Sequence, residues 1–141
     1  MIYARDDIDF KIIRNLKEKN KRERPFVYFS EKTCKPEDEE EFFHSGSYPS
    51  GHSAAAWTTA LVLSELFPEK SYEIIKHGYE VGQGRVICGY HWQSDVNNAR
   101  LIVSACLPVL HSDKKFKKYL KDAKKEKKRL YNKKNNDHIY K

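Results

Sequence analysis

Two histidines stand in contexts that suit acid–base or nucleophilic chemistry, and the clearer one is His91. Asp95 follows it by four residues, so on a helix its carboxylate lies one turn from the imidazole. A carboxylate bonded to one ring nitrogen fixes the tautomer and makes the other nitrogen a better nucleophile or base. Arg85 precedes His91 by six residues and could supply a cation. The same spacing is also typical of a surface His–Asp pair near the start of a helix.

The second histidine, His52, follows Ser50 and Gly51 at the start of the most apolar segment of the chain. If a helix begins here, its first backbone N–H groups and its partial positive charge favour an anion. Gly51 lets the backbone approach such a ligand closely, and His52 places a titratable group beside it. The alternative is an ordinary serine N-cap followed by a histidine without a chemical role.

Two cations, Lys17 and Arg24, are seven residues apart in a strongly charged stretch. On a continuous helix this spacing is about 700° of rotation, which places both side chains on one face, roughly 10 Å apart. Two fixed cations suit a phosphate group, which arginine can bind in a fork. A solvated charged face would have the same composition, because exposed charges often contribute little.

The elements that must position these residues are helices. Apolar residues recur at helical spacing, prolines are typical of the helix ends, and no alternating strand pattern of any length competes. We therefore predict an all-α fold, an irregular bundle of about five helices. The predicted segments are a helix at 6–23, a loop at 30–48, helices at 51–67 and 69–82, a non-helical connection from Gly82–Gly84 onward, and helices at 93–110 and 113–130.

The positive charge of the chain lies at its C-terminal end. Residues 113–141 hold 13 Lys and Arg against 4 Asp and Glu, whereas residues 1–112 hold 14 against 16. We predict a single helical domain at 1–131 and a basic, disordered tail at 132–141. Such a composition is typical of a solvated, fraying helix. The alternative is a surface for an anionic partner, although we do not expect nucleic acid to be the main partner.

Several classes of protein are excluded by simple patterns. No apolar run approaches the ~20 residues of a membrane-spanning helix, so we expect no transmembrane segment. The first residues, Met1–Asp7, lack the basic flank and apolar core of a signal peptide. The three cysteines form no C-x-x-C pair and have no zinc-ligand spacing, so we expect no metal site.

Taken in order, the three clusters resemble the signature of a known superfamily. The patterns K-x6-R-P, P-S-G-H and R-x5-H-x3-D are similar to those of the type 2 phosphatidic acid phosphatases and vanadium haloperoxidases. The resemblance is closer to one branch, the class A bacterial non-specific acid phosphatases, and it covers Lys17 to Lys128. The stretches that carry this closer resemblance are Ser47–His52, Thr59–Glu65 and Arg85–Val96.

The resemblance implies the fold of that superfamily, here N-terminally short, and a metal-independent acid phosphatase with broad specificity for phosphate monoesters. His91 would attack phosphorus and form a phosphohistidine, Asp95 would orient His91, and His52 would protonate the leaving oxygen. No cofactor is expected, and vanadate or phosphate should inhibit the reaction. The residues that would hold the phosphate are Lys17, Arg24, Ser50, Gly51, His52 and Arg85.

The resemblance also implies export to the periplasm, where disulfides form and persist. Cys34 and Cys88 stand where the family has cysteines, so they could pair in that compartment. Cys106 lies among apolar residues, and we expect it to be a buried small hydrophobe.

Three departures from the family pattern bear on activity. Gly84 stands where the family usually has serine, and Ser53 where it usually has threonine. Family members carry further N-terminal helices, whereas 16 residues precede Lys17 here. Without those helices we expect exposed apolar surface around Trp57 and Leu61, and association into homo-oligomers. The alternatives to an active acid phosphatase are a catalytically inactive or partial phosphatase-like anion-binding protein and a lipid phosphate phosphatase.

Overall fold

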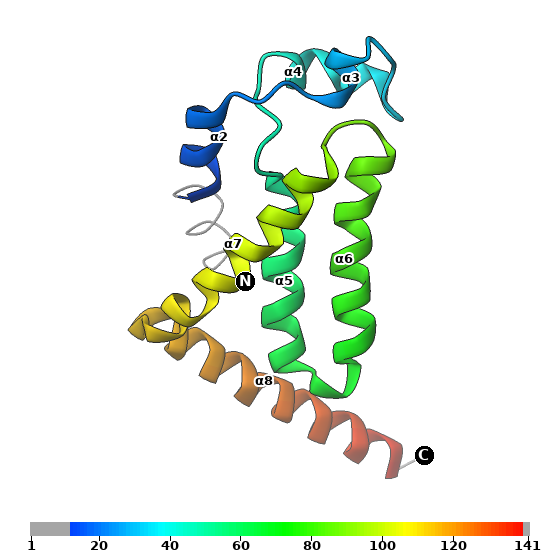
Figure 1. The fold of residues 1–141 in the computed structure, drawn as a ribbon. Helices are drawn as coiled ribbons and strands as arrows, with labels where there is room; N and C mark the ends of the chain where they lie inside the picture. The colour runs from blue at the N-terminus through cyan, green and yellow to red at the C-terminus, as the bar shows by residue number, and fades with distance from the viewer. Residues whose placement is uncertain (1–11, 140–141) are drawn as a thin grey trace.

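Helices α5 and α6 form a close antiparallel pair at the centre of the fold (Figure 1). The structure is a computed structural model, and it describes residues 12–139. α5 spans Gly51–Leu66 and α6 spans Ser71–Ile87, with a short 3-10 turn, η3 (Pro68–Lys70), between them. The pair can be close because a Cβ atom at Gly78 would lie 2.5 Å from the Cβ atom of Ala60. Only glycine fits at this crossing.

α6 continues through Gly82–Gly84, where we predicted that the helix would end. The prediction was wrong because Gly82 serves packing against α7 (Gln93–Ser112) rather than a turn. A Cβ atom at Gly82 would lie 2.9 Å from Cγ1 of Val96 and 2.8 Å from Nη2 of Arg100, both on α7. A Cβ atom at Gly84, by contrast, would meet no other part of the described chain within 4 Å.

α7 and the last helix, α8 (Lys114–Ile139), complete the core against α5. α8 runs across the turn between α5 and α6, where Lys127 donates a hydrogen bond to the carbonyl of Leu66 at 2.8 Å (Figure 1). The buried apolar residues of the core are Ile13, Ala54, Val62, Ala99, Val103, Leu110 and Phe116. The backbone of α8 stays helical beyond the predicted end at 130, and the division into a domain at 1–131 and a tail at 132–141 remains a prediction.

Short helical elements precede α5 and lie over or beside the end at which it begins (Figure 1). They are α2 (Arg14–Asn20), α3 (Pro25–Tyr28), η2 (Pro36–Asp38) and α4 (Glu39–Phe43). The helix predicted at 6–23 ends at Asn20 instead, and its residues 6–11 lie outside the described part. Pro25 begins α3, because a first-turn proline needs no N–H donor. The predicted loop at 30–48 contains η2 and α4, so that prediction was wrong for 36–43.

The predicted all-α class is confirmed, since the residues described contain helices and no β-strand. Within 12–139, no helix is both long enough and apolar enough to cross a membrane. Trp57 and Leu61, which we expected to be exposed, are partly buried against the core. Cys106 is also only partly buried and carries no disulfide. Association into homo-oligomers remains a prediction.

Candidate active site

A cavity of about 380 Å³ opens beside the N-terminus of α5 and brings five of the predicted residues together. Its wall is formed by Lys17, Arg24, Glu41, Phe42, Ser45, Gly51, His52, Ala55 and His91. Ser50, Arg85 and Asp95 were predicted to belong to the same site, but they lie outside this wall. Among the described residues, no group of His, Cys, Asp and Glu side chains is arranged to hold a metal ion.

Lys17 and Arg24 line one cavity, but not for the reason predicted from their spacing. α2 ends at Asn20, and Lys21 adopts a left-handed conformation with a φ of 43°. From there the chain is extended to Arg24, whose φ and ψ are −81° and 150°. The Lys17 ammonium donates a hydrogen bond to the carbonyl of Gly46 at 2.8 Å. The two cations therefore meet across a change of backbone direction, not along one helix face.

The non-helical segment 21–24 ties the three sequence clusters together. The carbonyl of Arg22 accepts a hydrogen bond from the backbone N–H of Ser47 at 2.7 Å. The carbonyl of Glu23 accepts one from the indole N–H of Trp92 at 2.8 Å and one from the Ser47 hydroxyl at 3.2 Å. These bonds attach the segment both to the chain before α5 and to the start of α7.

Arg24 is buried, and the surrounding backbone holds its guanidinium. Its acceptors are the carbonyl oxygens of Phe42, Ser45, Gly46 and Tyr90 at 2.9 to 3.3 Å and the hydroxyl of Ser45 at 3.0 Å. The guanidinium also lies 5.0 Å from the centre of the Phe42 ring. Burial, and then the charge of Arg85, lower the pKa of Arg24 to about 10, so the side chain stays charged in neutral and acid solution. The cavity wall thus contains a fixed cation.

His91 is buried and lies between Arg24 and Asp95. Its Nε2 atom is 3.4 Å from Nη1 of Arg24, and because a guanidinium can only donate, this contact favours a lone pair on Nε2 and the proton on Nδ1. Nδ1 lies 3.5 Å from Oδ2 of Asp95, an ion-pair distance rather than a formed hydrogen bond. Burial lowers the pKa of His91 to about 4, and Lys17 and Arg24 add to this effect while Asp95 opposes it. The imidazole is therefore neutral above about pH 4.

Asp95 is fully buried, and its two carboxylate oxygens have different partners. Oδ2 accepts a hydrogen bond from the backbone N–H of Trp92 at 2.9 Å and faces His91. Oδ1 accepts one from Nη1 of Arg22, also at 2.9 Å. Burial alone would raise the pKa of Asp95, but the contacts with His91, Trp92 and Arg22 outweigh it and hold this pKa below its usual value. Asp95 is thus a carboxylate at neutral pH.

Ser50 caps α5, as the alternative interpretation of this cluster predicted. Its Oγ atom accepts hydrogen bonds from the backbone N–H and the hydroxyl of Ser53, at 3.3 Å and 2.8 Å. Both serines are buried. Gly51, the first residue of α5, does line the cavity, so the positive end of the helix borders it.

His52 is exposed at the cavity, with its ring centre 6.2 Å from that of Phe42. Its partial burial lowers its pKa, and the charges of Arg85, Arg24 and Lys17 lower it further, while Glu41 acts in the opposite direction. Both histidines of the site therefore have lowered pKa values in the free protein, whereas the expected chemistry requires His52 to be charged. An anion among these cations would favour the charged form.

Arg85 does not line the cavity, and its guanidinium lies 3.9 Å from the centre of the Tyr90 ring. Its Nε atom is buried and forms no hydrogen bond with the part of the chain described. The Tyr90 hydroxyl donates to the carbonyl of Lys35 at 2.8 Å. A disulfide between Cys34 and Cys88, whose Cα atoms are 4.8 Å apart, joins the same loop to the end of α6. These links fix the surroundings of Arg85.

Sequence reasoning missed Arg22, Glu41, Phe42 and Tyr90. Glu41 belongs to an acidic run that is typical of a solvated surface, and nothing in that run indicates a cavity wall. Phe42 and Tyr90 stack edge to face, with ring centres 5.5 Å apart, and both lie under arginine side chains. Arg22 stands two residues before Arg24. This spacing indicates a role for Arg22 at the site only once the segment is known not to be helical.

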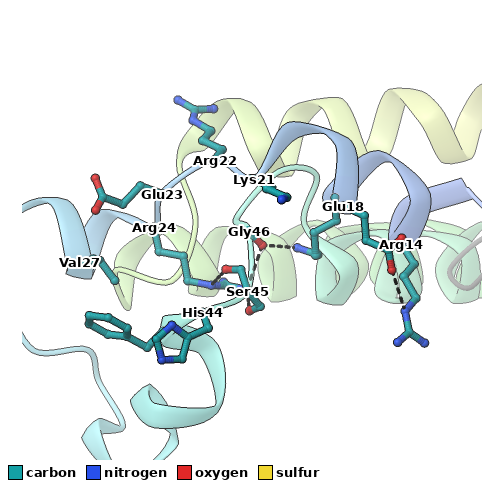
Figure 2. A pocket seen from close by; sticks show the side chains of 12 residues that line it. Arg14, Glu18, Lys21, Arg22, Glu23, Arg24, Val27, His44, Ser45 and Gly46 are labelled. Atoms are coloured by element: carbon teal, nitrogen blue, oxygen red, sulfur yellow. Dashed lines mark hydrogen bonds and ion pairs between the residues drawn. The ribbon is translucent and has the colours of Figure 1, made fainter.

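A larger cavity of about 650 Å³ adjoins the first and shares Lys17, Arg24 and Ser45 with it (Figure 2). Its wall carries charges of both signs. Figure 2 shows the side chain of Arg24 directed toward Ser45 and Gly46, and that of Arg22 directed to the opposite side of segment 21–24. Neither His52 nor His91 lines this cavity, whereas both line the smaller one.

Known proteins share these sequence features. A sequence model described as the PAP2 superfamily matches residues 11–118. The chain is 52% identical over 113 residues to a non-specific acid phosphatase from Providencia stuartii, covering 80% of this chain and 46% of that protein. It is 48% identical over 105 residues to a non-specific acid phosphatase from Salmonella typhimurium, covering 74% and 42%. It is 39% identical over 105 residues to an acid phosphatase from Zymomonas mobilis, covering 74% and 40%.

This chain spans less than half the length of these curated relatives. The family match nevertheless includes every residue that lines the cavity, from Lys17 to His91. The predicted resemblance to bacterial non-specific acid phosphatases is confirmed at the level of sequence. The chain belongs to the PAP2 superfamily.

Proposed function

We propose that this chain hydrolyses phosphate monoesters through a phosphohistidine formed on His91. One observation carries the proposal: His91 is buried and neutral, with Nε2 beside Arg24 and Nδ1 toward Asp95, in a cavity that His52 also lines. In a neutral imidazole whose protonated ring nitrogen is oriented by a carboxylate, the other ring nitrogen has a free lone pair and can act as a nucleophile. The names of the relatives support the same reaction class.

In the first step, a phosphate ester binds with its oxygens near Arg24, Lys17 and the N-terminus of α5. The Nε2 lone pair of His91 attacks phosphorus, and the bond from phosphorus to the ester oxygen breaks. Positive charge develops on the ring as the N–P bond forms, and the Asp95 carboxylate stabilises it through the Nδ1 proton. The cations and the helix terminus stabilise negative charge on the transferring phosphoryl group.

His52 supplies and then recovers the proton that the reaction needs. Protonated His52 gives its proton to the leaving ester oxygen, which departs as an alcohol. The neutral imidazole then takes a proton from a water molecule as that water attacks the phosphohistidine. The N–P bond breaks, inorganic phosphate leaves, and both histidines return to their starting forms. Phosphate bound beside Arg24 and Lys17 would raise the pKa of His52 and so favour its acid form.

The side chains of the cavity favour broad specificity. Besides its charged and polar groups, the wall contains Phe42 and Ala55, which would offer apolar surface to the rest of a substrate. Recognition would then depend on the phosphate group, which also accounts for the expected inhibition by inorganic phosphate or vanadate. The proposed steps use side chains and water alone, so we expect the reaction to be independent of metal ions and cofactors.

We also propose that the protein acts in the periplasm. The disulfide between Cys34 and Cys88 supports this location, because such bonds persist in oxidising compartments. From the length of the loop that it closes, the disulfide should stabilise the fold by about 4 kcal/mol. Urea unfolding with and without dithiothreitol measures this contribution, and equal stability in both conditions would contradict it.

Hydrolysis of p-nitrophenyl phosphate between pH 4 and 8, with and without EDTA, tests the proposed function. We expect hydrolysis that survives EDTA, is inhibited by phosphate or vanadate, and is lost in His91→Ala. The matched control is Arg129→Ala, which changes an exposed side chain of α8 that pairs with its neighbour Glu126. Full activity in His91→Ala would overturn the proposal. If the folded wild-type chain binds phosphate without turnover, the anion-binding alternative is favoured. If it hydrolyses phosphatidic acid in detergent but not p-nitrophenyl phosphate, a lipid phosphatase is favoured.

A further inference from the structure

Arg22 is a second arginine of segment 21–24, and its side chain reaches the first turn of α7 instead of the cavity. Its Nη1 atom donates hydrogen bonds to Oδ1 of Asp95 at 2.9 Å and to the hydroxyl of Ser94 at 2.7 Å. Its guanidinium carbon lies 5.2 Å from the centre of the Trp92 ring. Three contacts with successive parts of one helical turn fix the position of this cation.

The carboxylate that Arg22 holds is the one that faces His91. The Asp95 side chain is 0% exposed, so an ionised form needs a compensating partner for each oxygen. Oδ2 has the backbone N–H of Trp92, whereas Oδ1 has Arg22. Without Arg22, the carboxylate could rotate about its terminal bond or take up a proton. Either change would remove the oxygen that faces the Nδ1 atom of His91.

Two arginines of one short segment thus act on opposite nitrogens of the same imidazole. Arg24 lies 3.4 Å from Nε2, while Arg22 bonds the carboxylate that lies 3.5 Å from Nδ1. Figure 2 shows the two side chains on opposite sides of the segment. Arg24 lines the catalytic cavity and Arg22 does not, so they differ in their access to phosphate.

We propose that Arg22 is a positioning residue for phosphoryl transfer, which keeps Asp95 oriented toward Nδ1 and so presents the Nε2 lone pair of His91 to phosphorus. This inference rests on the proposed function. The Arg22 side chain is 40% exposed while that of Asp95 is fully buried, so Arg22→Ala leaves a buried carboxylate without its charged partner and should also cost stability. A positioning role is distinguished from a purely structural one by the rate of the reaction and by the tautomer of His91 in the folded protein.

The kinetic test compares Arg22→Ala with Arg22→Lys and with the control Arg129→Ala. Mutation of a residue that orients a metal ligand typically costs about 10- to 100-fold in activity, and we expect a comparable cost for the residue that orients Asp95. We expect a fall of that size in the kcat of Arg22→Ala, with an unchanged KM and an unchanged Kd for inorganic phosphate. Arg22→Lys should recover part of kcat, because an ammonium can still donate to Oδ1. A kcat equal to that of the wild type, or a loss confined to phosphate binding, would overturn the inference.

The second readout needs no turnover. The 15N chemical shifts of the His91 ring in the free protein should report the Nδ1–H tautomer in the wild type and a mixture of tautomers in Arg22→Ala. An unchanged tautomer would overturn the positioning role. If the wild type does not hydrolyse phosphate esters, the proposed function fails, yet this measurement still decides the role of Arg22. Should Arg22→Ala not fold, Ser94→Ala removes one of the two acceptors of Arg22 and should shift kcat and the tautomer in the same direction.

Discussion

The Nη1 atom of Arg24 lies 3.4 Å from the Nε2 atom of His91, while its own hydrogen bond to the carbonyl of Tyr90 is 2.9 Å long. The same guanidinium is bonded to three further backbone carbonyls from the chain before α5. Arg24 therefore holds the architecture of the cavity and also supplies a cation to it. Its two roles predict a combined effect on stability and on anion binding.

Replacement of Arg24 by lysine should weaken both properties. A lysine ammonium cannot reach four separated carbonyls, so buried acceptors lose their donors, and we expect the free energy of unfolding to fall by about 2–4 kcal/mol. Urea unfolding measures this loss, and calorimetric titration should show weaker binding of inorganic phosphate.

The matched control is Arg100→Lys. Arg100 is a buried arginine that does not line the cavity, and its Nη2 atom donates to the carbonyl of Tyr79 and to Gln83. This variant should lose stability without losing affinity for phosphate. Equal phosphate affinity in Arg24→Lys and the wild type would show that Arg24 is structural only.

Two glycines of α6 should respond oppositely to alanine. Gly84→Ala fills open space within a helix, so we expect the free energy of unfolding to rise by about 0.5–1 kcal/mol. Gly82→Ala places a Cβ atom against Val96 and Arg100, so we expect a loss of about 1–3 kcal/mol. Parallel urea titrations check both values, and stabilisation by Gly82→Ala would contradict the close packing of α6 on α7.

Burial of neutral His91 should make the protein less stable in acid. The unfolded chain protonates this imidazole near its ordinary pKa of about 6.5, whereas the folded protein does so near 4. Between these values the unfolded state binds more protons, so the free energy of unfolding should fall by up to about 3 kcal/mol as the pH is lowered through this window. Unfolding series at several pH values measure the slope. The dependence of the unfolding free energy on pH should become weaker in His91→Gln and stay unchanged in His44→Gln, which alters an exposed histidine. Equal slopes in the two variants would show that His91 is not the group responsible.

Phosphate should raise the pKa of His52. Partial burial and then the charges of Arg85, Arg24 and Lys17 lower this pKa in the free protein, and a bound dianion would offset those charges. By linkage, phosphate should bind more tightly as the pH falls through the pKa of His52. An NMR titration of the His52 ring, with and without inorganic phosphate, tests this. The ring of His111, near the far end of α7, serves as the internal reference, and identical His52 titrations in the two conditions would refute the prediction.

The elements with strong local signals could be predicted from the sequence, and those set by distant contacts could not. α5 was predicted because its apolar residues end at Pro68, and α7 because its core face repeats at helical spacing. The prediction failed at Gly82 because a glycine can either end a helix or allow two helices to pack closely. Only the position of Val96 on α7 shows that Gly82 allows close packing.

The same limit applies to the site. Lys17, Arg24, Gly51, His52 and His91 were all predicted to meet, and all line one cavity. Residues 21–24 carry charged side chains that suit a helix, but bonds to Ser47 and Trp92 extend this segment. Those bonds join residues far apart in sequence, so no local pattern indicated the role of Arg22.

The most direct measurement of the central claim is to trap the phosphoryl group on the enzyme. The chain is mixed with p-nitrophenyl phosphate and denatured in alkali, where a histidine–phosphorus bond survives. The Cys34–Cys88 disulfide is then reduced with dithiothreitol and the protein is digested with trypsin. The peptide Val86–Arg100 contains His91 and no other histidine. We predict that mass spectrometry finds a phosphoryl group on this peptide in the wild type and none in His91→Ala. Turnover by the wild type with the phosphoryl group on another peptide, or on none, would contradict the mechanism.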